Sequence, residues 1–248
     1  MEKLIILADA SKASLMYLGL LLKRFGIKVV PVQNGLEVLK MIKRHSPDLI
    51  MLNVRLDGVD GISTLRHIKA DMVIAQIPVI MISTDMSPET VNTCRALGCS
   101  DYLSKPIKVD NLHAAIQNAF FAGSSSPVRK YIRTAYNKKI SVHSNGDKYE
   151  LQTEVLSGGG VYVRKEEPLP IGTDVAVTLH LESAKKLQLK GKVIYTKETS
   201  GDLSNLSPGM AIQFYGLSEQ EQEDMNNYLK TLVAGDILEG QQEKVLMR

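Results

Sequence analysis

The stretch Asp48-Leu49-Ile50-Met51-Leu52, which runs directly into Asn53, decides the fold of the first half of the chain. Such an apolar run is typical of a strand buried on both faces of a parallel sheet. Similar runs are found at Leu4–Ala8, Ile27–Pro31, Pro78–Ile82 and Asp101–Leu103. Helical patterns separate them, at Ser11–Phe25, Gly35–Arg44, Ile62–Ala70, Pro88–Leu97 and Val109–Phe121. Five strands alternating with five helices predict a doubly wound α/β domain with a five-stranded parallel sheet.

The carboxyl ends of these predicted strands carry polar side chains. Asp9 follows the first strand, Asn53 the third and Ser83 the fourth, while Lys105-Pro106 comes shortly after the fifth. In an open α/β sheet, ligands bind in the crevice outside these strand ends. We therefore expect these side chains to line the functional crevice of this half.

Residues 1–121 resemble a response-regulator receiver domain. The resemblance is carried by five segments: Ala8-Asp9-Ala10-Ser11-Lys12, Pro47-Asp48-Leu49-Ile50-Met51-Leu52-Asn53, Asp60-Gly61, Ile80-Met81-Ile82-Ser83 and Asp101-Tyr102-Leu103-Ser104-Lys105-Pro106. It implies that Ser83, Tyr102 and Lys105 match residues that respond to phosphorylation in the family.

Two positions depart from the receiver pattern. The family carries two adjacent acids where this chain has Asp9-Ala10, and its phospho-accepting aspartate aligns with Asn53. An amide is a poor nucleophile toward phosphoryl donors, and Mg²⁺ is usually held by carboxylates. We therefore expect a pseudo-receiver with a degenerate phosphorylation site, in which the Lys105 ammonium pairs with Asp9 in place of the lost cation. Its residues are Asp9, Asn53, Ser83, Tyr102 and Lys105.

Inherited packing alone would also explain why the sequence retains Tyr102 and Lys105. Asp57 is expected to be an exposed loop carboxylate and not a substitute phospho-acceptor.

Receiver domains often pair through their fourth helix, fifth strand and fifth helix. By resemblance, a dimerising or partner-docking surface would be drawn from residues 88–121.

The hydrophobic period changes after Pro127. Alternating patterns, typical of half-buried strands, occur at Tyr149–Val155, Asp174–Leu181, Leu187–Tyr195 and Met210–Phe214. Turn signals at 145–147, 170–172 and 207–209 separate them. About six strands predict a small antiparallel β-barrel. Ser218 is expected to cap a C-terminal helix that continues through Val233. The predicted domains are residues 1–121 and 129–234, with a linker at 122–128 and a loosely ordered tail at 235–248.

The second half resembles a PilZ domain, a barrel that binds the bacterial second messenger cyclic di-GMP. Four segments carry the resemblance: Arg129-Lys130-Tyr131-Ile132-Arg133, Val155 to Val163 with Ser157-Gly158-Gly159-Gly160, Glu167 to Thr173, and Pro208 to Phe214. The resemblance implies a ligand site of Arg129, Arg133, Ser157 and Gly160 at the joint between the domains. Guanidinium groups suit phosphate oxygens and the O6/N7 edge of guanine.

One position of the second PilZ motif departs from the family. Val155 stands where the family has Asp or Asn, which by resemblance helps to hold a guanine. Losing this hydrogen bond would weaken binding roughly tenfold to a hundredfold unless Glu154 or a backbone carbonyl takes its place. Without a ligand, the arginines would be a solvated face, Ser157 would bond its own turn, and the glycines would serve a tight hairpin.

Composition is typical of a soluble globular protein. The chain has 248 residues, a net charge of +3 and no apolar run that could span a bilayer. Cys94 and Cys99 are expected to be reduced thiols in a cytoplasmic protein. No metal cluster or nucleophile–base set appears in the sequence, so no enzyme activity or cofactor is expected. The small net charge gives no argument for a nucleic-acid partner.

The sequence thus predicts a cyclic di-GMP-responsive effector in which ligand orders the segment that carries the arginines. The alternatives are a protein-interaction adaptor whose domains bind no small ligand, and an ordinary phosphorelay regulator, which Asn53 and Ala10 oppose.

Overall fold

The computed structural model describes residues 3–121, 131–181, 185–198 and 206–235. The chain divides into two compact units, of which the second is Tyr131–Val233. None of the helices in the described residues is long and apolar enough to cross a membrane.

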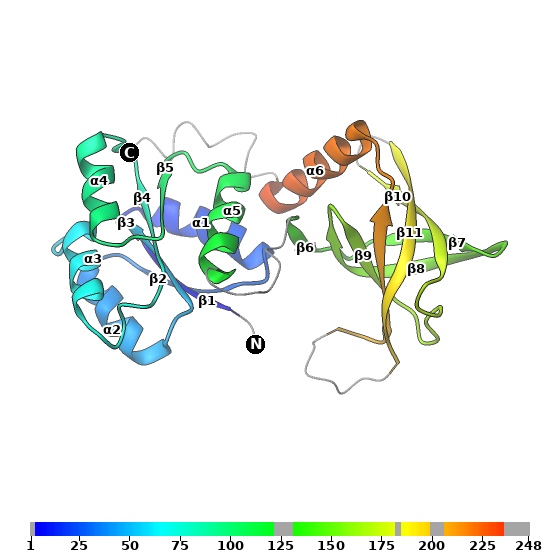
Figure 1. Ribbon diagram of the computed structural model, residues 1–248, viewed down its shortest axis with the longest axis horizontal. Helices are drawn as coiled ribbons and strands as arrows, with labels where there is room; N and C mark the ends of the chain where they lie inside the picture. The colour runs from blue at the N-terminus through cyan, green and yellow to red at the C-terminus, as the bar shows by residue number, and fades with distance from the viewer. Residues whose placement is uncertain (1–2, 122–130, 182–184, 199–205, 236–248) are drawn as a thin grey trace. The chain divides into compact units, whose positions relative to one another are not determined.

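The first unit is a parallel five-stranded sheet in the order β2-β1-β3-β4-β5, with helices on both faces (Figure 1). Its strands are β1 (Leu4–Ala8), β2 (Lys28–Val32), β3 (Leu49–Asn53), β4 (Val79–Ser83) and β5 (Asp101–Ser104). Its helices are α1 (Lys12–Arg24), α2 (Gly35–His45), α3 (Gly61–Ala70), α4 (Pro88–Ala96) and α5 (Val109–Phe121). The predicted doubly wound fold is confirmed, and the element boundaries differ by at most one residue at each end.

Apolar side chains point alternately to the two faces of this sheet and are buried on both. Ile6, Ile50 and Met81 pack on one face against α2, α3 and Cys94 of α4. The side chains between them, such as Leu7 and Met51, are also fully buried, because the sheet is covered on both faces. The helices begin at side chains that satisfy their free N–H groups: Ser11, Asn34, Asp60 and Ser87 each accept a bond from the first turn.

The second unit is an antiparallel barrel followed by one helix. Its strands are β6 (Arg133–Ala135), β7 (Lys139–Ser144), β8 (Asp147–Ser157), β9 (Gly160–Arg164), β10 (Asp174–His180), β11 (Lys186–Lys197) and β12 (Gly209–Tyr215). Their order is β6-β8-β7-β10-β11-β12-β9, and a further pairing of β8 with β9 closes the barrel. The predicted small barrel is confirmed. The four alternating patterns correspond to β8, β10, β11 and β12, so the pattern missed β6, which has only three residues, and also β7 and β9.

Helix α6 (Glu219–Ala234) packs on the barrel core through Met225, Tyr228 and Leu229. Ser218 begins the helix as predicted, because its hydroxyl accepts from Glu221 N at 3.2 Å while Glu221 Oε2 accepts from Ser218 N at 2.8 Å. These reciprocal bonds form a capping box. The β7–β8 hairpin turns at Asn145 and Gly146, whose φ angles of 52° and 89° suit a tight hairpin turn.

Candidate functional site

The carboxyl ends of β1 and β3 bring Asp9 and Asn53 together in a buried polar cluster. Asp9 is 1% exposed and Asn53 is 8% exposed. Asn53 Nδ2 donates to Asp9 Oδ1 at 3.0 Å, and Asn53 Oδ1 accepts from Arg55 N at 3.2 Å. A carboxylate at position 53 could not donate in this way, and two carboxylates this close would repel each other. The amide therefore suits a site that holds one acid.

Gly61 fixes the approach of the following loop to Asn53. A Cβ at Gly61 would lie 2.0 Å from the Asn53 carbonyl oxygen, so no side chain fits there. Asp60 accepts from Ser63 N and so begins α3 at this point. The Asp60-Gly61 pair of the sequence pattern thus has a packing role beside the crevice. Asp57 in the same loop is exposed, as expected.

Lys105 supplies the positive charge of the crevice. Its Nζ lies 2.5 Å from Asp9 Oδ2, and the two side chains are 9% and 1% exposed. Asp9 also accepts from Ser11 N at 3.0 Å and from Ser14 Oγ at 2.6 Å. The ion pair expected between Lys105 and Asp9 is present. Ser14, which sequence reasoning missed, reaches Asp9 from the first turn of α1.

Ser83 and Tyr102 lie on the neighbouring strands β4 and β5. Ser83 is 1% exposed, and its Oγ accepts from Asp85 N at 2.9 Å. Tyr102 donates its hydroxyl to the Asp85 carbonyl at 2.5 Å, and burial raises the pKa of this phenol. Both hydroxyls therefore bind the Asp85 loop, and neither is hydrogen-bonded to Asp9.

In the barrel, strand pairing places Arg133, Ser157 and Gly160 in one row. Arg133 of β6 is opposite Ser157 of β8, and Ser157 is opposite Gly160 of β9. Residues directly opposite each other share a face of the sheet. The structure therefore brings these three predicted site residues together, with Arg133 exposed and Ser157 9% exposed. Arg129, the fourth predicted residue, lies outside the described residues.

A second row lies beside the first on the same face, because side chains two apart on a strand point the same way. Ala135 is opposite Val155, which is opposite Tyr162 of β9. Burial raises the pKa of the Tyr162 phenol to about 12, and its hydroxyl donates to the Ser207 carbonyl at 2.7 Å. This row offers no carboxylate to a guanine.

Glu154 is engaged elsewhere. Its carboxylate lies 2.5 Å from Arg164 Nε and accepts from Ser207 N at 3.3 Å. Although burial opposes ionisation, hydrogen bonds from Ser207 and Arg164 hold the pKa of Glu154 below its ordinary value. The expectation that Glu154 could take the place of the missing acid therefore finds no support in this arrangement.

Packing, and not backbone conformation, requires glycine in the β8–β9 turn. None of Gly158, Gly159 and Gly160 has a positive φ. At Gly160, a Cβ would lie 2.4 Å from the Ile212 carbonyl oxygen of β12, so strand packing already requires glycine there. Ser157 Oγ donates to the Gly160 carbonyl at 3.0 Å, which is the turn bond that the alternative interpretation foresaw. The hydroxyl keeps lone pairs for a further donor.

Sequence families agree with this two-part architecture. The family described as the response regulator receiver domain matches residues 5–117, and the PilZ domain family matches residues 127–231. The chain is a receiver domain followed by a PilZ domain. PilZ domains are the domain class of cyclic di-GMP-binding effectors, and receiver domains belong to two-component signalling.

Similar proteins match the receiver domain. The polar-differentiation response regulator DivK of Brucella anthropi is 28% identical over 118 residues, which cover 48% of this chain and 96% of DivK. The transcriptional regulatory protein ZraR of Escherichia coli K12 is 33% identical over 115 residues, which cover 46% of this chain and 26% of ZraR. A crystal structure of a putative response regulator from Chloroflexus aurantiacus has a TM-score of 0.47 at 22% identity, covering 48% of this chain and 98% of that one.

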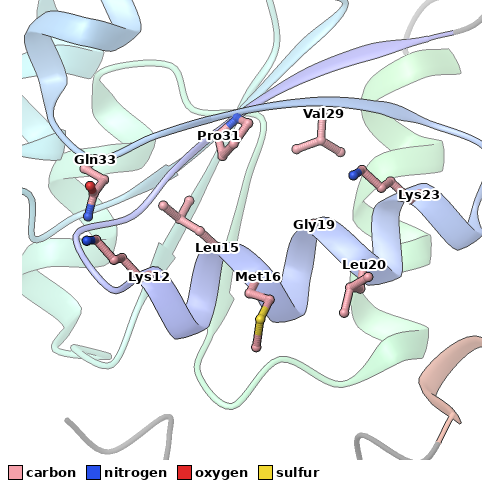
Figure 2. Close-up of a pocket in the computed structure, with 9 residues that line it drawn as sticks. All are labelled: Lys12, Leu15, Met16, Gly19, Leu20, Lys23, Val29, Pro31 and Gln33. Carbon is pink, nitrogen blue, oxygen red and sulfur yellow. The ribbon is translucent and has the colours of Figure 1, made fainter.

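The receiver domain also has a groove of about 410 Å³ between α1 and β2 (Figure 2). Met16 and Leu20 of α1 border it and are 65% and 39% exposed. Lys12 and Lys23 lie toward its two ends. The lining carries no carboxylate, thiol or imidazole, so the groove has no catalytic set.

The exposed residues of the surface predicted for pairing, residues 88–121, are polar, glycine or small apolar ones, the last being Pro88, Ala96, Pro106 and Ala114. No large apolar side chain is exposed in this range, all of which the structure describes, whereas Met16 and Leu20 are exposed on α1. Pairing through 88–121 stays a prediction. Within the residues that the structure describes, no group of three or more His, Cys, Asp or Glu side chains could hold a metal ion.

Proposed function

We propose that the PilZ domain binds cyclic di-GMP on the barrel face that carries Arg133, Ser157 and Gly160, with Arg129 as a further contact. The observation that carries this proposal is the register of β6, β8 and β9, which aligns these residues in one row. A guanidinium donates two parallel hydrogen bonds to a phosphate or to the O6/N7 edge of guanine. The ligand would thus contact the Arg133 guanidinium at one end of the row and the backbone of Gly160 at the other.

The neighbouring row sets the affinity. Val155 has no acceptor for guanine N1 and N2 hydrogens, and Glu154 already binds Arg164 and Ser207. A hydrogen bond to a charged partner contributes about 1.5–3 kcal/mol. We therefore expect binding roughly tenfold to a hundredfold weaker than a site with an acid at position 155 would give.

The receiver domain, in this proposal, acts without phosphorylation. Asn53 has no nucleophilic oxygen anion, and Asp9 is saturated by Ser11, Ser14, Asn53 and the Lys105 ammonium. The buried ammonium occupies the electrostatic role of a bound cation. The domain would serve dimerisation or partner docking in a bacterial cytoplasmic protein, and the barrel would supply the signal input. Incubation with a phosphodonor and Mg²⁺ tests this point, since stable modification of the crevice would contradict it.

Calorimetric titration of cyclic di-GMP into the full chain is the decisive experiment. The unmutated protein should bind, while Arg129→Ala and Arg133→Ala should each weaken binding at least tenfold. Lys190→Ala is the matched control, because Lys190 is an exposed cation on β11. No heat at micromolar ligand would remove the proposal, and equal affinity for Arg133→Ala and Lys190→Ala would move the site elsewhere.

A protein-interaction adaptor is the second candidate. Val155 and the turn bond of Ser157 favour it, because both reduce the hydrogen-bonding capacity of the ligand face. In this case, the unmutated chain would bind no cyclic di-GMP, and a protein partner would be retained equally in its presence and absence.

A further inference from the structure

The segment Tyr131–Arg133 is held against the β8–β9 turn by an aromatic ring. The Tyr131 side chain lies directly over Gly158 and Gly159. A Cβ added to Gly158 would lie 2.7 Å from Tyr131 Cδ1, and a Cβ added to Gly159 would lie 2.8 Å from Tyr131 Cδ2. Cβ atoms do not approach ring carbons this closely, so any side chain at either position would displace the ring.

Helix α6 completes the seat of this ring. Tyr131 donates its hydroxyl to Gln222 Oε1 at 3.3 Å. Gln222 Nε2 donates in turn to the Gly158 carbonyl at 3.4 Å and to Asn226 Oδ1 at 3.3 Å. The tyrosine therefore joins the arginine segment to the turn and to the helix at once.

Backbone conformation does not explain why both turn positions are glycine. Neither Gly158 nor Gly159 has a positive φ, so an L-residue could adopt their backbone conformations. These two positions instead receive the Tyr131 ring. The requirement is for space above the turn.

We propose that Tyr131 is a positioning residue for the ligand site, and that Gly158 and Gly159 form the surface on which its ring packs. The ring holds the chain two residues before Arg133, and the β6–β8 pairing holds it from Arg133 onward. In this proposal, contacts within the domain hold the chain around Arg133 before ligand binds, and the ordering of the segment by ligand stays a prediction for Arg129. A site that is already held in its binding geometry loses less binding free energy to the ordering of its own residues.

This inference rests on the proposed cyclic di-GMP site for its effect on affinity, but the seating of the ring can be measured without ligand. The chain contains no tryptophan, so Tyr131→Trp places a single fluorescent reporter over the turn. We expect its emission to shift to longer wavelength when Gly159→Ala is added, because the new Cβ pushes the ring toward water. An unchanged emission would refute the seating of the ring, whatever the ligand does.

Cyclic di-GMP titrations of the full chain test the positioning role. Tyr131→Ala and Gly159→Ala should each weaken binding roughly tenfold, and the double variant should be no weaker than either, because both remove one contact. Tyr131→Phe, which keeps the ring, should bind within about threefold of the unmutated chain. Additive losses, or unmutated affinity in Tyr131→Ala, would overturn the positioning role. If the unmutated chain binds no ligand, the proposed function and the positioning role fall together, and the fluorescence result still decides the seating.

Discussion

The buried pair of Lys105 and Asp9 allows a quantitative test of the crevice. In Lys105→Met, the Asp9 carboxylate stays 1% exposed but loses its counter-charge. Removing one partner of a buried pair typically costs about 3–5 kcal/mol. The donors from Ser11, Ser14 and Asn53 remain, so we expect the lower end, about 3 kcal/mol. This loss corresponds to roughly a hundredfold change in an opening equilibrium.

Hydrogen exchange in the full chain measures this change in the receiver domain alone. Amides of β1 and β3 should exchange roughly a hundredfold faster in Lys105→Met, while amides of β10 and β11 should be unchanged. Lys3→Met is the matched control, since the Lys3–Asp48 pair has a similar separation of 2.6 Å but side chains that are 50% and 32% exposed. Exposed pairs contribute about 1 kcal/mol at most. If the two variants behave alike, the buried ammonium does not stabilise the crevice.

Three further predictions follow from the same contacts. Val155→Asn should tighten cyclic di-GMP binding roughly tenfold in calorimetry, because it adds an acceptor beside Tyr162 on the proposed ligand face; unchanged affinity would show that the ligand does not reach this row. Asn53→Asp should destabilise the receiver domain in the absence of Mg²⁺, because the new carboxylate would face that of Asp9. Added Mg²⁺ should restore stability, since carboxylates bind this ion; a thermal unfolding temperature that does not change with Mg²⁺ would contradict this prediction. Hydrogen bonds from Ser207 and Arg164 lower the pKa of Glu154 despite its burial, so the ionised carboxylate should contribute its full stability above its ordinary pKa of 4.5 and lose it as pH falls through the lower folded pKa. The difference in unfolding free energy between the unmutated chain and Glu154→Gln should therefore shrink between about pH 5 and pH 3 in urea unfolding. A difference that stays constant over this range would refute the role of the Glu154 carboxylate.

The receiver half could be predicted closely because its local signals agree with one another. Apolar runs indicate the five strands, and the strand ends place Asp9, Asn53 and Lys105 at one edge of the sheet from the sequence alone. The polar contact from Ser14 could not be predicted in this way, because a serine in a first helical turn usually serves the helix itself. Only the packing of α1 against β1 brings its hydroxyl to Asp9.

The sequence pattern predicts the strands of the barrel less completely than those of the receiver domain. Alternation revealed the long strands, but β6 is too short to show a period, and its place beside β8 depends on closure of the whole barrel. The glycines of the β8–β9 turn could be singled out from the sequence, but their contacts with Tyr131 and Ile212 could not. A glycine that makes room for a distant ring looks the same in sequence as one that permits a turn, and the three strands β6, β7 and β8 separate Tyr131 from Gly158 along the chain.

The three residue pairs of β6 with β8 also make the entry of the barrel its mechanical weak point. Tension applied to the chain ahead of Tyr131 would first load these pairs and the contacts of the Tyr131 ring. Only after they yield would force reach β7, which pairs with β8 at six positions. Under a pulling force, we therefore expect β6 to detach as a separate step while the rest of the barrel stays closed.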